Sequence, residues 1–278
     1  MRDVLLALVL ALCAPTAFAA MQTQPLHWSA DGQRFSGYLV YDDAIDTPRP
    51  GLVMFPNWMG VSEAALVQAR EIAGDDHVVL VADVYGSALR PENATEAAAA
   101  VKDVYGDGGT RLRLRADAAV EALKAEAGRV PLDATRIGVF GFCFGGSVAL
   151  ELVRSGAELA GAVSFHGGLE RHLPAGKEPI RTPVLVLNGA ADSSVTAAHI
   201  SAFQQEMDAA GADWQFVNFG GAVHCFAQPE SQSPPNCMYD PRAARRAFAM
   251  MAQFFEAQFD RERVPERPVP DRQKENGR

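Results

Sequence analysis

A lone cysteine lies in a glycine-rich stretch that directly follows an apolar run. The stretch 141–145 reads GFCFG, the cysteine version of the strand-to-helix turn that presents a nucleophile. Glycines are needed there because a Cβ at either flanking position would strike the neighbouring strand or helix. The N-terminal amides of the following helix favour a thiolate at Cys143. A small buried cysteine in a glycine turn is the alternative, and no GK[ST] follows to suggest a phosphate-binding loop.

An aspartate and a histidine follow two later apolar runs. VLVLNGAAD places Asp192 just past one run, and VNFGGAVH places His224 just past the next. Each residue alone would more often belong to an ordinary loop. The chain order nucleophile, acid, histidine is the order of the triad in α/β-hydrolases. We therefore predict a triad in which Cys143 attacks, His224 transfers the proton and Asp192 orients the imidazole.

Other candidate site residues also follow apolar runs. The backbone N–H groups of Phe144 and Trp58 are expected to form an oxyanion hole. Asn57, Tyr85 and His166 are expected to contact substrate. For His166 a structural hydrogen bond is the alternative role. The histidines show no shared spacing that suggests a metal site, and no cofactor is expected.

The elements that must position these residues are short apolar runs alternating with helix-like segments. Continuous apolar runs predict strands buried on both faces at 51–55, 78–82, 137–140, 161–165, 184–187 and 215–219. Helical patterns occupy 63–73, 111–127, 147–154, 197–210 and 241–259. A hairpin is predicted over 26–41, with Asp31 and Gly32 at its turn. The alternation predicts an α/β fold, with a mostly parallel central sheet flanked by helices.

Composition and charge limit the classes of protein that this chain can be. The 278 residues carry a formal net charge of −9, which argues against nucleic-acid binding because phosphate contacts need clustered Lys and Arg. Residues 21–260 are predicted to form a single domain. Residues 261–278 are rich in charge and proline and are predicted to be a disordered tail.

The first twenty residues have the features of a signal peptide. Arg2 precedes an apolar run at 4–12, and 17–19 supply the small-x-small pattern that a signal peptidase cleaves. The run is too short to span a bilayer comfortably. Residues 1–20 are therefore predicted to be removed, leaving an exported protein, periplasmic or secreted, with no stable membrane insertion.

Three cysteines remain after such a cleavage. Cys225 and Cys237 lie 12 positions apart on either side of a proline-containing loop. An oxidising compartment makes pairing plausible, so a disulfide between these two is our hypothesis. Cys143 would then carry the free thiol.

With these residues in place, the chain resembles the dienelactone hydrolase family over residues 26–259. The resemblance is carried by GFCFGG, NGAAD and GGAVHCF, together with PNWMG and ADVYG. It implies a single α/β-hydrolase domain without a cofactor. It also places the family's triad at Cys143, Asp192 and His224.

This sequence departs from the family pattern at three positions. Asn57 stands where members usually carry a glutamate that takes the proton of the resting thiol. Ser87 and Gln228 stand where enzymes acting on dienelactone hold the substrate carboxylate with two arginines. Because serine and glutamine cannot replace bidentate guanidinium groups, the substrate is not expected to be dienelactone itself.

The sequence thus predicts an exported cysteine hydrolase for a small ester, lactone or thioester, acting through an acyl-thioester intermediate. Glutaminase-like amidotransferases also use an elbow cysteine, but there the histidine precedes its acid. The alternative is a non-catalytic or redox-sensing exported protein that keeps the fold. Asn57 favours that alternative, and a Cys143–Cys225 bridge would disable the nucleophile. The sequence indicates neither the substrate's identity nor the oligomeric state.

Overall fold

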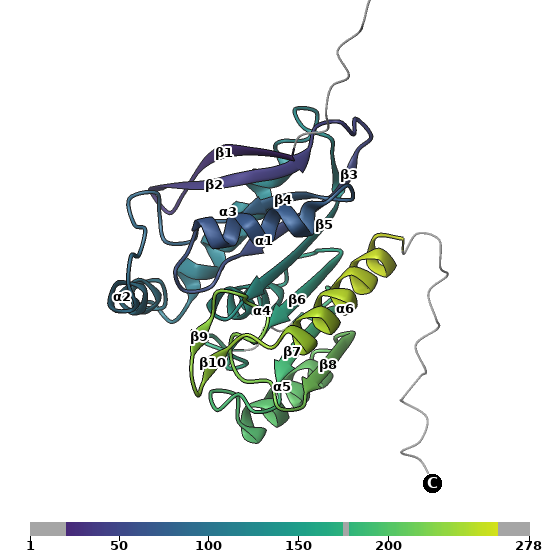
Figure 1. The fold of residues 1–278 in the computed structure, drawn as a ribbon. Helices are drawn as coiled ribbons and strands as arrows, with labels where there is room; N and C mark the ends of the chain where they lie inside the picture. The colour runs from purple at the N-terminus through teal and green to yellow at the C-terminus, as the bar shows by residue number, and fades with distance from the viewer. Residues whose placement is uncertain (1–20, 175–177, 261–278) are drawn as a thin grey trace, which may run out of the picture.

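The computed structural model of the protein describes residues 21–174 and 178–260 and is built on an eight-stranded sheet (Figure 1). The strand order is β1-β2-β4-β3-β5-β6-β7-β8. The strands are β1 (Met21–Ala30), β2 (Gln33–Asp42), β3 (Arg49–Phe55), β4 (Val78–Val81), β5 (Leu132–Phe142), β6 (Gly161–Phe165), β7 (Val184–Gly189) and β8 (Trp214–Phe219). A separate pair, β9 (Gln232–Ser233) and β10 (Cys237–Met238), lies near β8 in sequence.

The sheet is parallel apart from its first two strands. β1 and β2 form an antiparallel hairpin, and β2 runs antiparallel to β4. Asp31 and Gly32 both have positive φ at the hairpin turn, as the Asp-Gly pair predicts. The remaining neighbours from β4 to β8 are parallel. The predicted α/β fold with an N-terminal hairpin is confirmed, and β1 and β8 are the edge strands.

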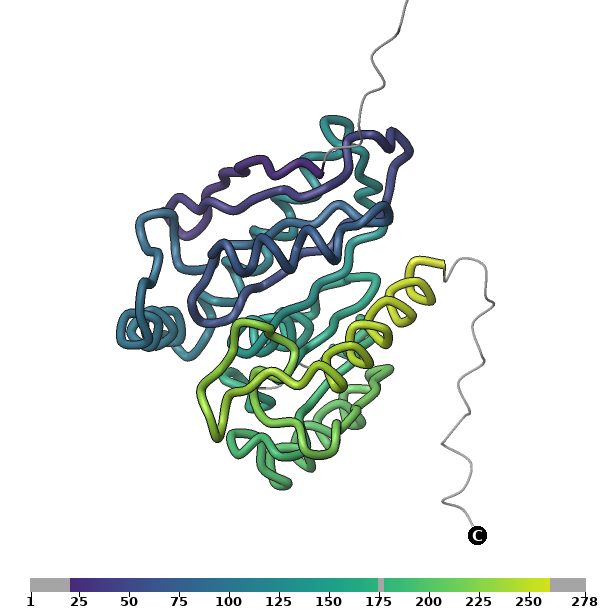
Figure 2. Tube along the Cα trace, viewed as in Figure 1, coloured from purple at the N-terminus to yellow at the C-terminus, as the bar shows by residue number. Residues whose placement is uncertain are grey.

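Helices cover both faces of the sheet (Figures 1 and 2). α1 (Glu63–Ala73) and α6 (Pro241–Phe259) bury apolar residues against one face. The other face packs against α3 (Thr110–Lys124), α4 (Phe144–Arg154) and α5 (Ala197–Ala209), with α2 (Ala94–Val104) beyond them. The sheet therefore separates two apolar layers. The edge of the sheet at which the parallel strands end lies outside both layers and can hold polar side chains.

The helix boundaries follow from local capping. Ser62 caps α1 by accepting the Ala65 N–H, and Asp240 caps α6 just before Pro241 at its first position. α2 is capped by Asn93 and was not predicted. Residues 1–20 and 261–278 lie outside the described residues, so the signal peptide and the disordered tail remain predictions.

The helix that follows the cysteine turn is held by buried charges. Glu151 of α4 is fully buried and accepts from Arg113 Nε of α3 at 2.8 Å and from Arg154 Nη1 at 3.0 Å. Arg154 also contacts Glu206 of α5 at 2.8 Å. These pairs connect α4 to both neighbouring helices through charge-assisted hydrogen bonds.

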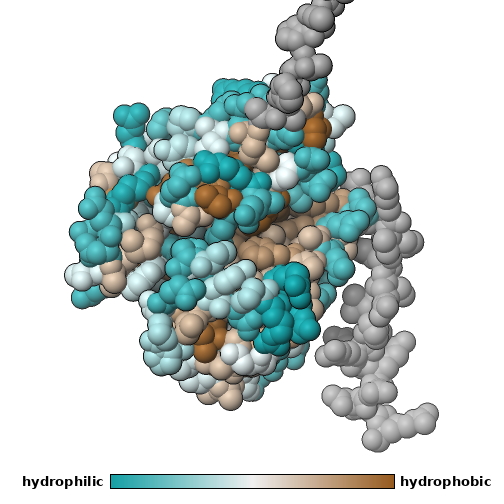
Figure 3. Space-filling view, in the orientation of Figure 1, coloured by the Kyte–Doolittle hydropathy of each residue, from teal (hydrophilic) through white to brown (hydrophobic). Residues whose placement is uncertain are grey.

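Apolar surface is visible in Figure 3 over the furrow between α1 and α6. A cavity of about 410 Å³ there is lined by Ile72, Phe248, Met251 and Phe255, among others. Within the described part of the chain, no helix is both long and apolar enough to cross a membrane.

Candidate active site

The cysteine turn joins β5 to α4 without an intervening loop. β5 ends at Phe142 and α4 begins at Phe144, so Cys143 alone makes the turn, with a φ of +53°. Such a φ is rare for a residue with a Cβ and is stored strain of the kind found at functional sites. The turn presents the thiol at the carboxyl edge of the sheet, and Cys143 is partly exposed.

The flanking glycines are required by contact distances. A Cβ at Gly145 would lie 1.9 Å from the Phe55 carbonyl oxygen, and one at Gly141 would lie 2.2 Å from the Gly145 carbonyl. A Cβ at Gly146 would lie 2.7 Å from Ser164 Oγ. Side chains at these positions would push α4 away from β3 and β6, so the GxCxGG pattern is a packing requirement.

The structure brings the three predicted triad residues together. The Nδ1 of His224 lies 2.6 Å from Asp192 Oδ2, and its Nε2 lies 3.0 Å from Cys143 Sγ. Asp192 follows β7 and His224 follows β8, so the carboxyl ends of three parallel strands supply one residue each. The imidazole can exchange a proton with the thiol while the carboxylate fixes its tautomer.

The charges of the site support an imidazolium. Burial alone would lower the pKa of His224, but hydrogen bonds to Asp192 and Cys143 outweigh it and raise that pKa to about 10. Burial alone would raise the pKa of Asp192, because it disfavours the charged carboxylate. The hydrogen bonds to His224 and Ser194 outweigh burial and leave the pKa of Asp192 below its usual value. A protonated His224 therefore faces the Cys143 sulfur at 3.0 Å.

Ser194 is a supporting residue that the sequence analysis missed. Its N–H donates to Asp192 Oδ1 at 2.9 Å, and its hydroxyl donates to the same oxygen. Oδ2 remains directed at His224. An aspartate followed two residues later by a serine is typical of such a turn, so the sequence held a signal for it.

The two predicted oxyanion donors lie at the ends of adjacent strands. Phe144 N begins α4, and Trp58 follows β3 in a turn where Asn57 Oδ1 accepts the Met59 N–H at 2.9 Å. Among the described residues, neither the Trp58 nor the Phe144 N–H has a hydrogen-bond partner. β3 and β5 pair directly, so both donors belong to the same edge of the sheet.

Tyr85 and His166, the other two predicted substrate contacts besides Asn57, are both buried. The Tyr85 hydroxyl donates to the Trp58 carbonyl at 2.8 Å, and the ring stacks on Phe144, which leaves the residue buried. His166 is fully buried, and its Nδ1 accepts the Cys143 N–H at 3.1 Å. Burial, and then the neighbouring His224, hold the pKa of His166 well below its usual value. Both residues support the turns beneath the site, so the structural alternative for His166 fits better.

The remaining positions of interest are Cys225, Cys237, Ser87 and Gln228. Cys225 and Cys237 form a disulfide, and Cys143 is the free cysteine within the described residues. Ser87 is exposed. Gln228 is buried and donates to Glu230 at 3.2 Å.

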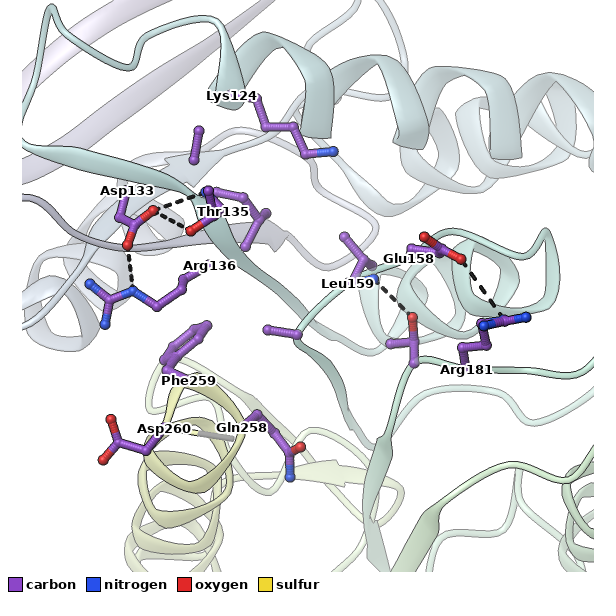
Figure 4. A pocket seen from close by; sticks show the side chains of 14 residues that line it. Lys124, Asp133, Thr135, Arg136, Glu158, Leu159, Arg181, Gln258, Phe259 and Asp260 are labelled. Atoms are coloured by element: carbon purple, nitrogen blue, oxygen red, sulfur yellow. Dashed lines mark hydrogen bonds and ion pairs between the residues drawn. The ribbon is translucent and has the colours of Figure 1, made fainter. Parts of the chain in front are cut away.

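A large cavity lies away from this site. It has a volume of about 840 Å³ and lies at the amino ends of β5, β6 and β7 (Figure 4). Two ion pairs lie within its lining, Asp133 with Arg136 at 2.6 Å and Glu158 with Arg181 at 3.9 Å. The described residues contain no cluster of three side chains that could hold a metal ion. The reactive groups are therefore those at the opposite edge of the sheet.

Comparisons with known proteins show which sequences and structures this chain is similar to. The model of the dienelactone hydrolase family matches residues 35–259. A dienelactone hydrolase-like promiscuous phosphotriesterase from metagenomic libraries is 34% identical, with a TM-score of 0.79 over 86% of this chain and 99% of that one. An uncharacterized protein of Caenorhabditis elegans is 33% identical over 157 residues, covering 54% of this chain and 95% of its own. A putative carboxymethylenebutenolidase of Yersinia pestis is 25% identical over 223 residues, covering 74% and 81%.

Proposed function

Because the chain belongs to the dienelactone hydrolase family, a family of ester and lactone hydrolases, we propose that Cys143, His224 and Asp192 hydrolyse a small ester, lactone or thioester. The observation that carries the proposal is the position of one imidazole between a carboxylate and a thiol, at 2.6 and 3.0 Å. A partly exposed histidine bridging a free cysteine and a buried aspartate is the arrangement that nucleophilic catalysis requires.

The first half of the reaction forms an acyl-enzyme. The Cys143 thiolate attacks the carbonyl carbon, and the carbonyl oxygen takes up negative charge next to the Trp58 and Phe144 N–H groups. Donors fixed before the reaction stabilise that charge without reorganisation. When the intermediate collapses, the His224 imidazolium donates its Nε2 proton to the leaving alkoxide, and a thioester to Cys143 remains.

The second half releases the acid. Neutral His224 now accepts a proton from water, and the resulting hydroxide attacks the thioester carbonyl. Collapse of this intermediate breaks the carbon–sulfur bond and restores the thiolate and the imidazolium. Asp192 stays ionised throughout and holds the imidazole in place.

The substrate is proposed to lack the carboxylate that dienelactone carries. Ser87 has no charge, and the Gln228 side chain is buried against Glu230. Neither can form bidentate bonds to a carboxylate. Asn57 uses its side-chain oxygen to accept the Met59 N–H, so the proposed cycle relies on the His224 imidazolium to keep Cys143 ionised.

Hydrolysis of short-chain aryl esters tests the proposal. The wild-type protein should hydrolyse them and give a mass adduct of one acyl group on Cys143, and Cys143→Ala should lose both. Ser194→Ala, which keeps the triad, should retain the adduct at a lower rate. No turnover by wild type across acyl chain lengths and pH would refute the proposal and favour the non-catalytic alternative.

We also propose that the protein is exported. The Cys225–Cys237 disulfide supports this, because such bonds persist in oxidising compartments. N-terminal sequencing of protein recovered from the cell envelope fraction should begin at Ala20 or Met21. An intact N-terminus on that protein would contradict cleavage.

A further inference from the structure

The loop that carries His224 has little regular structure of its own. β8 ends at Phe219, and the next strand pairing is the two-residue ladder of β9 and β10. On its amino side the loop is fixed by the Ala222 carbonyl, which accepts the Ala191 N–H at 2.9 Å. That bond connects the loop to the turn holding Asp192. The carboxyl side of His224 needs a separate anchor.

The disulfide supplies that anchor. Cys225 directly follows His224, has a φ of +62° and is 7% exposed. Its sulfur is bonded to Cys237 in β10. His224 also forms a β-bridge with Cys237, in which the Met238 N–H donates to the His224 carbonyl at 3.0 Å. The histidine backbone is thus joined to one short segment by a covalent bond and a hydrogen bond.

The segment that receives the disulfide is itself attached to the fold. The Tyr239 N–H donates to the Ser231 carbonyl at 3.0 Å, and the Asp240 N–H donates to the Phe226 carbonyl at 3.1 Å. Asp240 then caps α6, which packs on the sheet. The disulfide therefore links the backbone at His224 to α6 as well as to β8.

We propose that the Cys225–Cys237 disulfide is a positioning element for His224, so that the hydrolase is active when this bond is formed and impaired when it is reduced. This inference rests on the proposed function of the triad. Without the bond, the positive φ of Cys225 beside the catalytic histidine has to be held by backbone hydrogen bonds and by the packing of the buried Phe226. Displacement of a catalytic group by about 1 Å costs on the order of 100-fold in rate.

A consequence is that added reductant should act on the Cys225–Cys237 disulfide and leave the Cys143 thiol as it is. A phosphine reductant and water convert the disulfide to two thiols and a phosphine oxide, whereas Cys143 is already a thiol. Reductants normally protect thiol enzymes from oxidation. Here the same treatment should lower turnover because His224 loses its anchor.

The test compares the oxidised full-length protein, the phosphine-reduced protein and the reduced protein after reoxidation. Peptide mapping follows Cys225 and Cys237, and circular dichroism checks that the fold is kept. We expect reduction to lower kcat at least tenfold with KM changed less than twofold, and reoxidation to restore it. Alkylation of Cys143 should also become slower, because His224 Nε2 no longer lies within hydrogen-bond distance of its sulfur.

The double variant Cys225→Ala with Cys237→Ala is the matched control, since it keeps both Cβ atoms and removes the bond. It should behave like the reduced protein and should not respond to the phosphine. An unchanged kcat and alkylation profile in both bond-free forms would overturn the inference. Loss of the whole fold in both would also overturn it, because the bond would then support the domain rather than the histidine. Lack of turnover by the oxidised protein would instead refute the proposed function.

Discussion

Replacement of Gly145 by alanine tests whether close packing under the nucleophile sets both stability and rate. The new Cβ would lie 1.9 Å from the Phe55 carbonyl oxygen and 2.4 Å from the Pro56 carbonyl oxygen. Contacts of this kind are essentially never below 3.0 Å, so α4 and the end of β3 must separate by about 1.1 Å. Both contacts are to backbone, which cannot rotate away as a side chain could.

The expected cost follows from that displacement. Overpacking of a close-packed interior costs roughly 1–3 kcal/mol. For a domain of this size, that corresponds to a melting temperature lower by about 2–12 °C. The same movement separates the Phe144 N–H from the Trp58 N–H, because the two flank the contact. A misplacement of about 1 Å should reduce kcat on the order of 100-fold.

Denaturant unfolding and aryl ester hydrolysis measure the two effects separately. Gly220→Ala is the matched control, because a Cβ there meets nothing within 4 Å and its φ lies outside the left-handed region. It should change the free energy of unfolding by no more than about 0.5 kcal/mol. If Gly145→Ala equals wild type in both assays while folding normally, the reasoning about the elbow is wrong.

Three further predictions concern the charges around the site. Asp192→Asn should lower kcat by roughly 10³–10⁴-fold in steady-state assays, because the amide favours the wrong tautomer of His224; a loss below tenfold would contradict this role. Folding raises the pKa of His224 to about 10. The protonated imidazole therefore contributes its full share to the free energy of unfolding below about pH 6.5, and this contribution is lost as the pH rises toward 10. The loss is at most about 1.4 kcal/mol per pH unit. Denaturant titrations across this range should show that decline in wild type and less of it in Asp192→Asn. Glu151→Gln should lower the free energy of unfolding by about 3–5 kcal/mol, since it removes the buried carboxylate that pairs with Arg113 and Arg154 and leaves Arg154 with Glu206 alone; Glu158→Gln, in an exposed pair, should change it by less than about 1 kcal/mol, and equal effects would contradict the argument.

Elements with strong local signals were predicted well. The bounds of α1 and α6 agree with the expected 63–73 and 241–259, because each begins at a capping residue followed by an amphipathic pattern. The alternation of apolar runs and helices also predicted the parallel sheet. α2 was missed because its alanine-rich sequence has few large apolar residues to mark a buried face.

The residues of the candidate site that could be predicted are those whose place follows from their order along the chain. Chain order placed Asp192 and His224 after adjacent strands, and the structure brings them within 2.6 Å of each other. Burial is a tertiary property, so the sequence could not distinguish a substrate contact from a supporting residue at Tyr85 or His166. Their positions at strand ends suggested a pocket. In the structure, the Tyr85 ring stacks on Phe144, and the His166 Nδ1 accepts the Cys143 N–H.

The edge strand β1 bears on how copies of this protein behave at high concentration. An edge strand offers unpaired N–H and C=O groups to any passing strand, and ten residues are enough to template an aggregate. Pro25 lies near the middle of β1 and has no N–H to offer. The hairpin therefore closes one side of the sheet while presenting an interrupted row of donors, which disfavours strand-by-strand self-association at this edge.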